Sequence, residues 1–190
     1  MNIGIDIGGS HISAALVNKD QITSKVEIQI TENDKININE FIETSLVKLI
    51  NTILIKNSLY IADIDMIGIA SPGNIVRKKV ITNCVNLGIK KLDIYSVLRK
   101  YYKYVDIKVK NDAKCAATAE KLYGNLKGYR NALFLCFGTG VGGAIVFNNK
   151  ILEAKNCTGF ELGHITINKN GPMCKCGKKG CFDVYGAMKN

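Results

Sequence analysis

A cluster of metal-binding side chains near the end of the chain constrains its fold more than any other feature. The cluster comprises one imidazole and three thiols: His164, Cys174, Cys176 and Cys181. One histidine and three cysteines form the ligand set of a tetrahedral Cys₃His zinc site. Gly177 and Gly180 allow the tight loop that ligation at this spacing requires. Because the spacing is not that of a zinc finger, the sequence predicts a structural zinc knuckle inside a larger fold.

The remaining cysteines are scattered along the chain: Cys84, Cys115, Cys136 and Cys157. They stand among apolar neighbours, and a total of seven cysteines excludes complete internal disulfide pairing. We therefore expect these four to be free buried thiols. The clustering of the other three favours zinc over unrelated free cysteines. An alternative interpretation of His164 is a surface histidine that lies beside a metal ion bound by other ligands.

The length and apolar content of the chain are those of a globular protein. Its 190 residues suffice for one domain and a fraction, or for two small domains, and 47% of them are hydrophobic. No apolar run reaches the roughly 18 residues that would span a bilayer. The segment Met1–Asp6 has neither the basic region nor the apolar segment of a secretion signal. We therefore expect a cytoplasmic protein that does not bind a membrane.

The formal net charge of the chain is +10, a feature that many nucleic-acid-binding proteins share. The lysines are nevertheless spread along the sequence, without a basic block or an interleaved aromatic stripe. This distribution favours a solvated basic surface over a nucleic-acid partner. A basic surface also attracts an anionic nucleotide.

Hydrophobic periodicity predicts α/β organisation in the first part of the chain. Apolar residues alternate over residues 3–7 and 12–16, which is typical of a β-hairpin, and residues 21–30 add a third strand. Helical spacing follows over residues 38–53. The further expected elements are a strand at 64–70, a helix at 92–102, a strand at 105–109 and a helix at 111–123.

The pattern changes in the last third of the chain. Residues 132–137 and 144–147 are expected strands on either side of a glycine turn at 138–143, and the remainder is rich in loops. No long helix follows to cover these strands, and small units bury little of their surface. We therefore predict an N-terminal α/β domain at residues 1–115 and a partial C-terminal α/β domain at residues 116–190.

The first motif that suits phosphate binding is Asp6-Ile7-Gly8-Gly9-Ser10, at the tip of the predicted hairpin. Two glycines let a ligand approach the backbone N–H groups closely, and the Ser10 hydroxyl adds a donor. The Asp6 carboxylate could hold a hydrated Mg²⁺. An ordinary Gly-Gly hairpin turn is the alternative.

A second glycine motif runs from Gly138 to Gly143 and matches the spacing of a dinucleotide-binding turn. That turn requires a helix after it, whereas residues 144–147 have strand character. We therefore exclude a dinucleotide site of this type. The motif is better interpreted as a second glycine hairpin that contacts phosphates, with a structural tight turn as the alternative.

Asn111 and Asp112 stand where a predicted strand gives way to a predicted helix. Both residue types are favoured as helix caps, which is the simplest interpretation. The alternative is catalytic, because a helix N-terminus keeps an aspartate ionised. An ionised Asp112 could accept the proton of an alcohol during phosphoryl transfer.

These motifs, in this order, resemble those of the ROK family (repressor, open reading frame, kinase). The resemblance covers essentially the whole chain and includes Asn111-Asp112-Ala113, Glu161-Leu162-Gly163-His164 and the segment from Cys174 to Cys181. The cysteine segment is the most specific part and resembles the zinc-containing glucokinase-like and N-acetylhexosamine kinase-like branches. The resemblance implies an actin-like ATPase fold of the hexokinase type (ribonuclease H-like). This fold is a pair of α/β domains around a cleft, and the C-terminal domain is incomplete in a chain of this length.

The resemblance also implies roles for individual residues. Asp112 would be the catalytic base, and Asp6 would orient Mg²⁺ and its water molecules. The implied contacts with ATP phosphates are Gly8, Gly9, Ser10, Gly138, Thr139 and Gly140. The implied contacts with sugar hydroxyls are Asn86, Asn111, Glu161, His164 and Asp183. Ser10, Phe160 and Asp183 depart from the family pattern, which has threonine, glycine and glutamate at these positions.

The activity that the resemblance implies is ATP-dependent phosphorylation of a hexose or an N-acyl hexosamine, most closely that of a glucokinase. Structural zinc, Mg²⁺ and ATP are the implied cofactors, and the full-length protein is expected to form a homodimer. One alternative is a sugar-sensing regulator of the same family without a DNA-binding domain, since Asp6 lies almost at the start of the chain. Another is a catalytically silent fragment that binds sugar or zinc.

Overall fold

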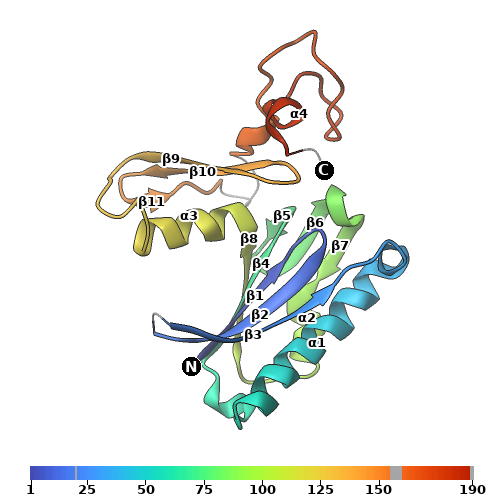
Figure 1. Cartoon of the computed structure of the whole chain (residues 1–190), viewed down its shortest axis with the longest axis vertical. Coiled ribbons are helices and arrows are strands. Elements are labelled where there is room, and N and C mark those ends of the chain that lie inside the picture. Colours follow the sequence, from blue (N-terminus) through green and yellow to red (C-terminus); the bar gives the residue numbers. More distant parts are fainter. Residues whose placement is uncertain (20, 155–159, 189–190) are drawn as a thin grey trace. The chain divides into compact units, whose positions relative to one another are not determined.

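The structure of the protein, a computed structural model, describes residues 1–19, 21–154 and 160–188 (Figure 1). Cys157, which the sequence predicts to be a buried thiol, lies outside these residues. The internal contacts divide the chain into two compact units, Met1–Asp112 and Ala113–Asn190. We describe each unit by itself.

The first unit is built on a five-stranded mixed sheet with the order β3-β2-β1-β4-β8 (Figure 1). Strands β1 (Asn2–Ile7), β2 (His11–Asn18) and β3 (Gln21–Gln29) are antiparallel and consecutive. Strands β4 (Met66–Ser71) and β8 (Asp106–Asn111) run parallel to β1. The alternation seen in the sequence explains β1, because Ile3, Ile5 and Ile7 are buried on one face of the sheet.

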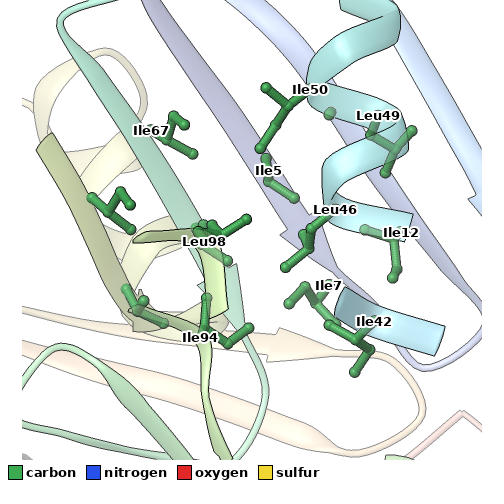
Figure 2. Packing of buried hydrophobic residues seen from close by; sticks show 14 of the residues in the cluster. Ile5, Ile7, Ile12, Ile42, Leu46, Leu49, Ile50, Ile67, Ile94 and Leu98 are labelled. Atoms are coloured by element: carbon green, nitrogen blue, oxygen red, sulfur yellow. The ribbon is translucent and has the colours of Figure 1, made fainter. Parts of the chain in front are cut away.

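Helix α1 (Ile38–Lys56) covers that face of the sheet. It follows a 3₁₀ turn, η1 (Asp34–Asn37), and its apolar residues recur at helical spacing. The fully buried side chains of Ile42, Leu46 and Ile50 pack toward those of β1 and β2 (Figure 2). Burial of each such side chain contributes about 1.5–3 kcal/mol. The helix predicted at residues 38–53 is therefore confirmed, with an additional turn.

The first unit also contains a small antiparallel sheet that the periodicity did not predict. It has the order β5-β6-β7 and comprises β5 (Asn74–Val76), β6 (Val80–Cys84) and β7 (Ile89–Asp93). A 3₁₀ turn, η3 (Val85–Leu87), joins the last two strands, and another, η2 (Ile61–Asp63), precedes β4. The buried residues Ile75, Ile81 and Leu92 attach this sheet to the core of the unit.

Helix α2 is shorter than the sequence indicates. The predicted helix at residues 92–102 begins only at Ile94 and ends at Arg99, because Leu92 and Asp93 belong to β7. The Asp93 side chain fixes the start by accepting a hydrogen bond from the Ser96 backbone N–H at 2.9 Å.

Helix α3 (Asp112–Leu122) begins at the last residue of the first unit. In the second unit it packs against a three-stranded antiparallel sheet of order β11-β10-β9 (Figure 1). Strand β9 (Ala132–Phe137) matches its predicted bounds, and β10 (Val141–Phe147) is followed by the short β11 (Lys150–Ile151). Strand β10 begins three residues before the prediction of 144–147, so the glycine turn is confined to residues 138–140. A Cβ at Gly142 would lie 3.0 Å from the Cβ of Ala113 in α3, so this glycine allows the close packing of helix on sheet.

The described residues after β11 are mostly loop, as the sequence predicts, with two short helical segments that it did not predict. These are a 3₁₀ turn, η4 (Leu162–His164), and helix α4 (Phe182–Gly186). Within the described part of the chain, none of the helices combines the length and the apolar character that crossing a bilayer would require.

Candidate functional site

The polar motifs of the first unit gather at one edge of its sheet. Strands β1, β4 and β8 are parallel, so their carboxyl ends meet at the same edge. Asp6 lies beside Ala70 in the register, and Ser71 lies beside Asn111. Open α/β sheets bind their ligands at this edge.

A hairpin turn, which we call the first glycine hairpin (Ile7–His11), extends β1 beyond this edge. The Gly8 backbone N–H donates to the His11 carbonyl oxygen at 2.9 Å and closes the turn. A Cβ at Gly9 would meet no atom within 4 Å, and Gly9 does not have a positive φ. The internal packing of the described residues therefore does not require glycine at position 9. A ligand that approaches the backbone here would require it.

Asp6 precedes this hairpin on β1. Partial burial of the carboxyl group raises the pKa of Asp6, and the nearby positive charges of His11 and Lys25 lower it to a lesser extent. The residue as a whole is exposed, so water still reaches it. A carboxylate in this position can bind a hydrated cation through the water shell of the ion.

Asp112 occupies the first turn of α3, directly after β8. The positive end of the helix dipole favours the ionised form of a carboxyl group in this position. Its neighbour Asn111 donates from Nδ2 to the Gly73 carbonyl oxygen at 3.3 Å. This bond ties the end of β8 to the turn that follows β4.

The charge of Asp112 affects the pKa of the buried Cys84 thiol. Burial is the main cause that raises the pKa of Cys84, and the charge of Asp112 raises it further. Backbone N–H groups of Leu87 and Asn86 act in the opposite direction. The charge of Asp112 therefore acts on the thiol that directly precedes the turn carrying Asn86, a relationship that spacing in the sequence could not reveal.

In the second unit, the second glycine hairpin (Phe137–Val141) joins β9 to β10. The Gly138 N–H donates to the Gly140 carbonyl oxygen at 2.9 Å, and the Gly138 carbonyl oxygen accepts from the Met188 N–H at 2.9 Å. A Cβ at Gly138 would meet no atom within 4 Å. Thr139 lies exposed between the two glycines. Gly138, like Gly9, is a glycine that internal packing of the described residues does not explain.

Asp183 in α4 contacts this hairpin. Its Oδ1 accepts a hydrogen bond of 2.7 Å from the Val141 backbone N–H. A Cβ at Gly140 would lie 2.7 Å from the same oxygen, so Asp183 explains the glycine at position 140. The sequence suggested a sugar contact for Asp183 and gave no indication of Val141 as its partner, because the two residues are distant along the chain.

The four predicted metal ligands come together in the second unit. One ligand atom from each of His164, Cys174, Cys176 and Cys181 lies within 4.8 Å of the others. The Sγ atoms of Cys176 and Cys181 are 3.6 Å apart, and the Cys174 Sγ is 3.7 Å from His164 Nδ1. Sulfur atoms bound to one tetrahedral zinc ion at about 2.3 Å stand about 3.8 Å apart. The donor set and its geometry therefore fit zinc.

The thiols of this cluster influence one another. A hydrogen bond from the Lys178 backbone N–H is the main cause that lowers the pKa of Cys176. Burial, followed by the neighbouring thiols, raises the pKa of Cys181 to about 11. Close thiols resist joint ionisation, and a divalent cation offsets that repulsion.

The loop around the cluster is tied down by its own backbone. Lys178 donates from Nζ to the His164 carbonyl oxygen at 2.9 Å, and the Cys174 N–H donates to the Lys178 carbonyl oxygen at 2.7 Å. Glu161 is exposed at the start of η4, and its carbonyl oxygen accepts from the His164 N–H at 3.0 Å. Phe160, at a position where glycine is usual in the family it resembles, has a φ of +57°. Glycine adopts this left-handed conformation readily, whereas a bulky residue such as Phe160 adopts it only at a cost in strain.

Comparisons with known proteins identify the family of the chain. The sequence matches the ROK family over residues 2–189. It is 34% identical to a glucokinase of Halalkalibacterium halodurans over 97% of this chain and 56% of that protein. It is 27% identical to a xylose repressor of Bacillus spizizenii over 99% of this chain and 48% of that protein. The chain thus spans about half the length of the curated relatives it matches.

The fold matches solved structures over the same extent. A ROK family glucokinase from Streptomyces griseus, crystallised with glucose and AMPPNP, superimposes with a TM-score of 0.83 at 24% identity. The match covers 98% of this chain and 57% of that one. The mixed α/β fold is therefore of the hexokinase type seen in actin-like ATPases, as the sequence predicts. The match of the family model over residues 2–189 shows that the chain belongs to the ROK family.

Proposed function

We propose that the protein phosphorylates a hydroxyl group of a hexose or an N-acyl hexosamine with ATP, as a glucokinase does. The observation that carries this proposal is the position of Asp112. It stands in the first turn of α3, at the sheet edge where β1 leads into the first glycine hairpin. Family membership and the similarity to a glucokinase support the same activity.

In this proposal Asp112 accepts the proton of the sugar hydroxyl as that oxygen attacks the γ-phosphorus of ATP. The bond between the γ-phosphorus and the bridging oxygen breaks, and ADP leaves with that oxygen. Phosphoryl transfer depends mainly on positioning and on stabilisation of negative charge, with little covalent chemistry from the protein. A base held ionised by a helix N-terminus suits this task at neutral pH. Asn111, fixed to the Gly73 carbonyl oxygen, would orient the sugar beside it.

The nucleotide would be held by backbone groups and by a cation. The proposed phosphate contacts are Gly8, Gly9, Ser10, Gly138, Thr139 and Gly140. Open space at Gly9 and at Gly138 supports this assignment, because phosphate oxygens could then approach the backbone N–H groups. Asp6 would hold Mg²⁺ through its water shell, and Mg²⁺ would neutralise charge on the phosphates.

The proposed sugar contacts are the polar side chains of Asn86 and Asn111 in the first unit, and those of Glu161, His164 and Asp183 in the second. His164 would serve the metal through Nδ1, which faces the Cys174 Sγ at 3.7 Å, and could then reach a sugar with Nε2. Zinc held by His164 and the three cysteines would have no open coordination position, so its role would be structural.

A substrate panel tests the proposal. The purified protein, with its zinc content measured, is incubated with Mg-ATP and with hexoses or N-acetylhexosamines, and sugar phosphate and ADP are quantified. We expect equal amounts of ADP and sugar phosphate with at least one sugar of the panel. If a folded, zinc-loaded sample phosphorylates none of the sugars in the panel, the proposed activity is contradicted.

The similarity to a xylose repressor favours a second candidate, a sugar-sensing regulator. Such a protein would bind the sugar without consuming ATP. Sequence-specific retention of DNA in a gel-shift experiment, released by a sugar and unaccompanied by phosphorylation, would favour this candidate over the kinase.

A further inference from the structure

We propose that Asp183 is a positioning residue that fixes the second glycine hairpin and couples its shape to the metal cluster. The consequence for catalysis rests on the proposed kinase function, whereas the coupling itself does not. Every contact involved lies within the second unit. This role differs from the sugar contact that family resemblance suggests for the same residue.

The carboxylate of Asp183 holds the hairpin at its last residue. Its Oδ1 accepts from the Val141 N–H at 2.7 Å, a short bond to a charged acceptor. Val141 is the first residue of β10, so this bond sets where the turn ends and the strand begins. A Cβ at Gly140 would lie 2.7 Å from that oxygen and would displace the carboxylate, so the carboxylate and the turn are closely fitted.

Two further contacts join α4 and the residues after it to the same hairpin. The Met188 N–H donates to the Gly138 carbonyl oxygen at 2.9 Å. The rings of Phe137 and Phe182 pack edge to face, with centroids 6.0 Å apart and an angle of 83° between their planes. Both ends of the turn are thus held by the segment that carries Asp183.

That segment is itself anchored in the metal cluster. Cys181 immediately precedes α4, and its carbonyl oxygen accepts from the Val184 N–H at 3.1 Å. The Phe182 N–H donates to the Ile165 carbonyl oxygen at 2.9 Å, directly after His164. A cation that draws Cys181 and His164 together therefore fixes both attachments of α4, and through Asp183 it fixes the hairpin.

The closing experiment measures hydrogen exchange of the hairpin by mass spectrometry or NMR, without nucleotide, in the zinc-loaded protein. Asp183→Ala removes the acceptor, so the Val141 amide should exchange about tenfold faster or more. Asp183→Asn keeps an oxygen that can accept the bond, so its exchange should stay within about threefold of the original protein. Removal of the metal with a chelator should speed exchange of the same amide in the unsubstituted protein.

Glu120→Ala is the matched control, because Glu120 accepts from the Asn125 backbone N–H at 2.8 Å elsewhere in the second unit. Its substitution should leave the hairpin unchanged. Exchange at Val141 that is the same in Asp183→Ala as in the original protein would overturn the proposal, as would equal acceleration in Asp183→Ala and Asp183→Asn. Because this readout requires no turnover, failure of the kinase proposal would leave it interpretable.

If the protein is a kinase, steady-state kinetics give a second readout. A positioning role predicts that Asp183→Ala raises KM for ATP while Asp183→Asn does not. A sole role in holding the sugar predicts an increase in KM for the sugar in both variants, with KM for ATP unchanged, and that outcome would contradict the proposal.

Discussion

The α-carbon of Gly163 packs so closely against the carbonyl oxygen of Val141 that a β-carbon at Gly163 would overlap that oxygen. Gly163 belongs to η4 and immediately precedes His164, whereas Val141 begins β10. The contact sets the distance between a predicted metal ligand and the sheet of the second unit. It also explains why the sequence has glycine at this position.

The variant Gly163→Ala should therefore disturb both the fold and the metal cluster. Backbone must move to admit the methyl group, which typically costs about 1–3 kcal/mol, and the movement displaces His164. We expect a lower midpoint of urea unfolding and a weaker affinity for zinc in competition with a chromogenic chelator. Gly138→Ala, at a glycine with open space around it, is the control and should change neither. Equal zinc affinity in the two variants would contradict this account of Gly163.

The glycines at Gly9 and Gly138 should matter for the nucleotide and not for stability. A methyl group fits at both positions without a clash, yet it would occupy the space that a phosphate needs. We expect Gly9→Ala and Gly138→Ala to unfold near the denaturant midpoint of the original protein and to raise KM for ATP several-fold. Gly68→Ala, in the middle of β4 and also without a clash, is the control and should leave KM for ATP unchanged. If both hairpin variants bind ATP normally, the two glycines do not serve the phosphates.

The metal cluster should hold about one zinc ion per chain. Cys176 is the exposed member of the cluster, so Cys176→Ser removes a ligand with little effect on packing. We expect this variant to lose most of its zinc during dialysis, as measured by elemental analysis. Cys136→Ser, at a thiol outside the cluster, should retain zinc. Retention of a full equivalent by the Cys176 variant would show that the cluster is not the metal site.

Tyr102 should make the first unit sensitive to alkaline pH. The residue is 6% exposed, and burial, with a smaller contribution from Tyr101, raises its pKa to about 12. In the unfolded chain the pKa of tyrosine is about 10, so the unfolded state loses the proton first. The stability that Tyr102 contributes is therefore complete below about pH 10 and is lost as the pH rises toward 12, by on the order of 2 kcal/mol.

The test compares urea unfolding at neutral and alkaline pH for Tyr102→Phe and Tyr104→Phe. Tyr102→Phe loses the hydrogen bond to the Asn51 Oδ1 (3.0 Å), at a cost of about 1 kcal/mol at neutral pH. It should then lose less stability above pH 10 than the original protein does. Tyr104, at 98% exposed, provides the control, and its variant should follow the original protein at every pH. Parallel pH profiles for all three proteins would exclude the proposed role of Tyr102.

The sequence predicted the elements whose periodicity is long and regular. The helix at 38–53 is confirmed because one buried face determines it. The strand at 132–137 is confirmed although none of its residues is fully buried, because its apolar run ends directly at a glycine turn. The small sheet of β5, β6 and β7 was missed because its strands are short. In addition, the turn between β5 and β6 has Arg77 and Lys78 at positive φ, where a turn signal would require glycine or asparagine.

The candidate site was predictable where neighbours in sequence are neighbours in space. Cys174, Cys176 and Cys181 share one loop, and their assembly with His164 could be inferred from spacing and ligand chemistry. Two relationships could not be inferred: the effect of the Asp112 charge on the pKa of Cys84, and the hydrogen bond from the Val141 N–H to Asp183. Each depends on tertiary packing between two segments that lie far apart along the chain and that no sequence motif links.

Turnover by Asp112→Asn tests the central claim most directly. Asparagine keeps the size of the side chain and cannot accept the proton, so kcat should fall about a hundredfold to ten-thousandfold while the dissociation constant of the sugar changes little. Asp106→Asn, at the exposed start of β8 where Asp106 pairs with Lys108, should retain full activity. A loss of turnover confined to Asp112→Asn, with sugar binding intact by calorimetry, is the result we predict. Near-normal turnover by Asp112→Asn would contradict the assignment of this residue as the base.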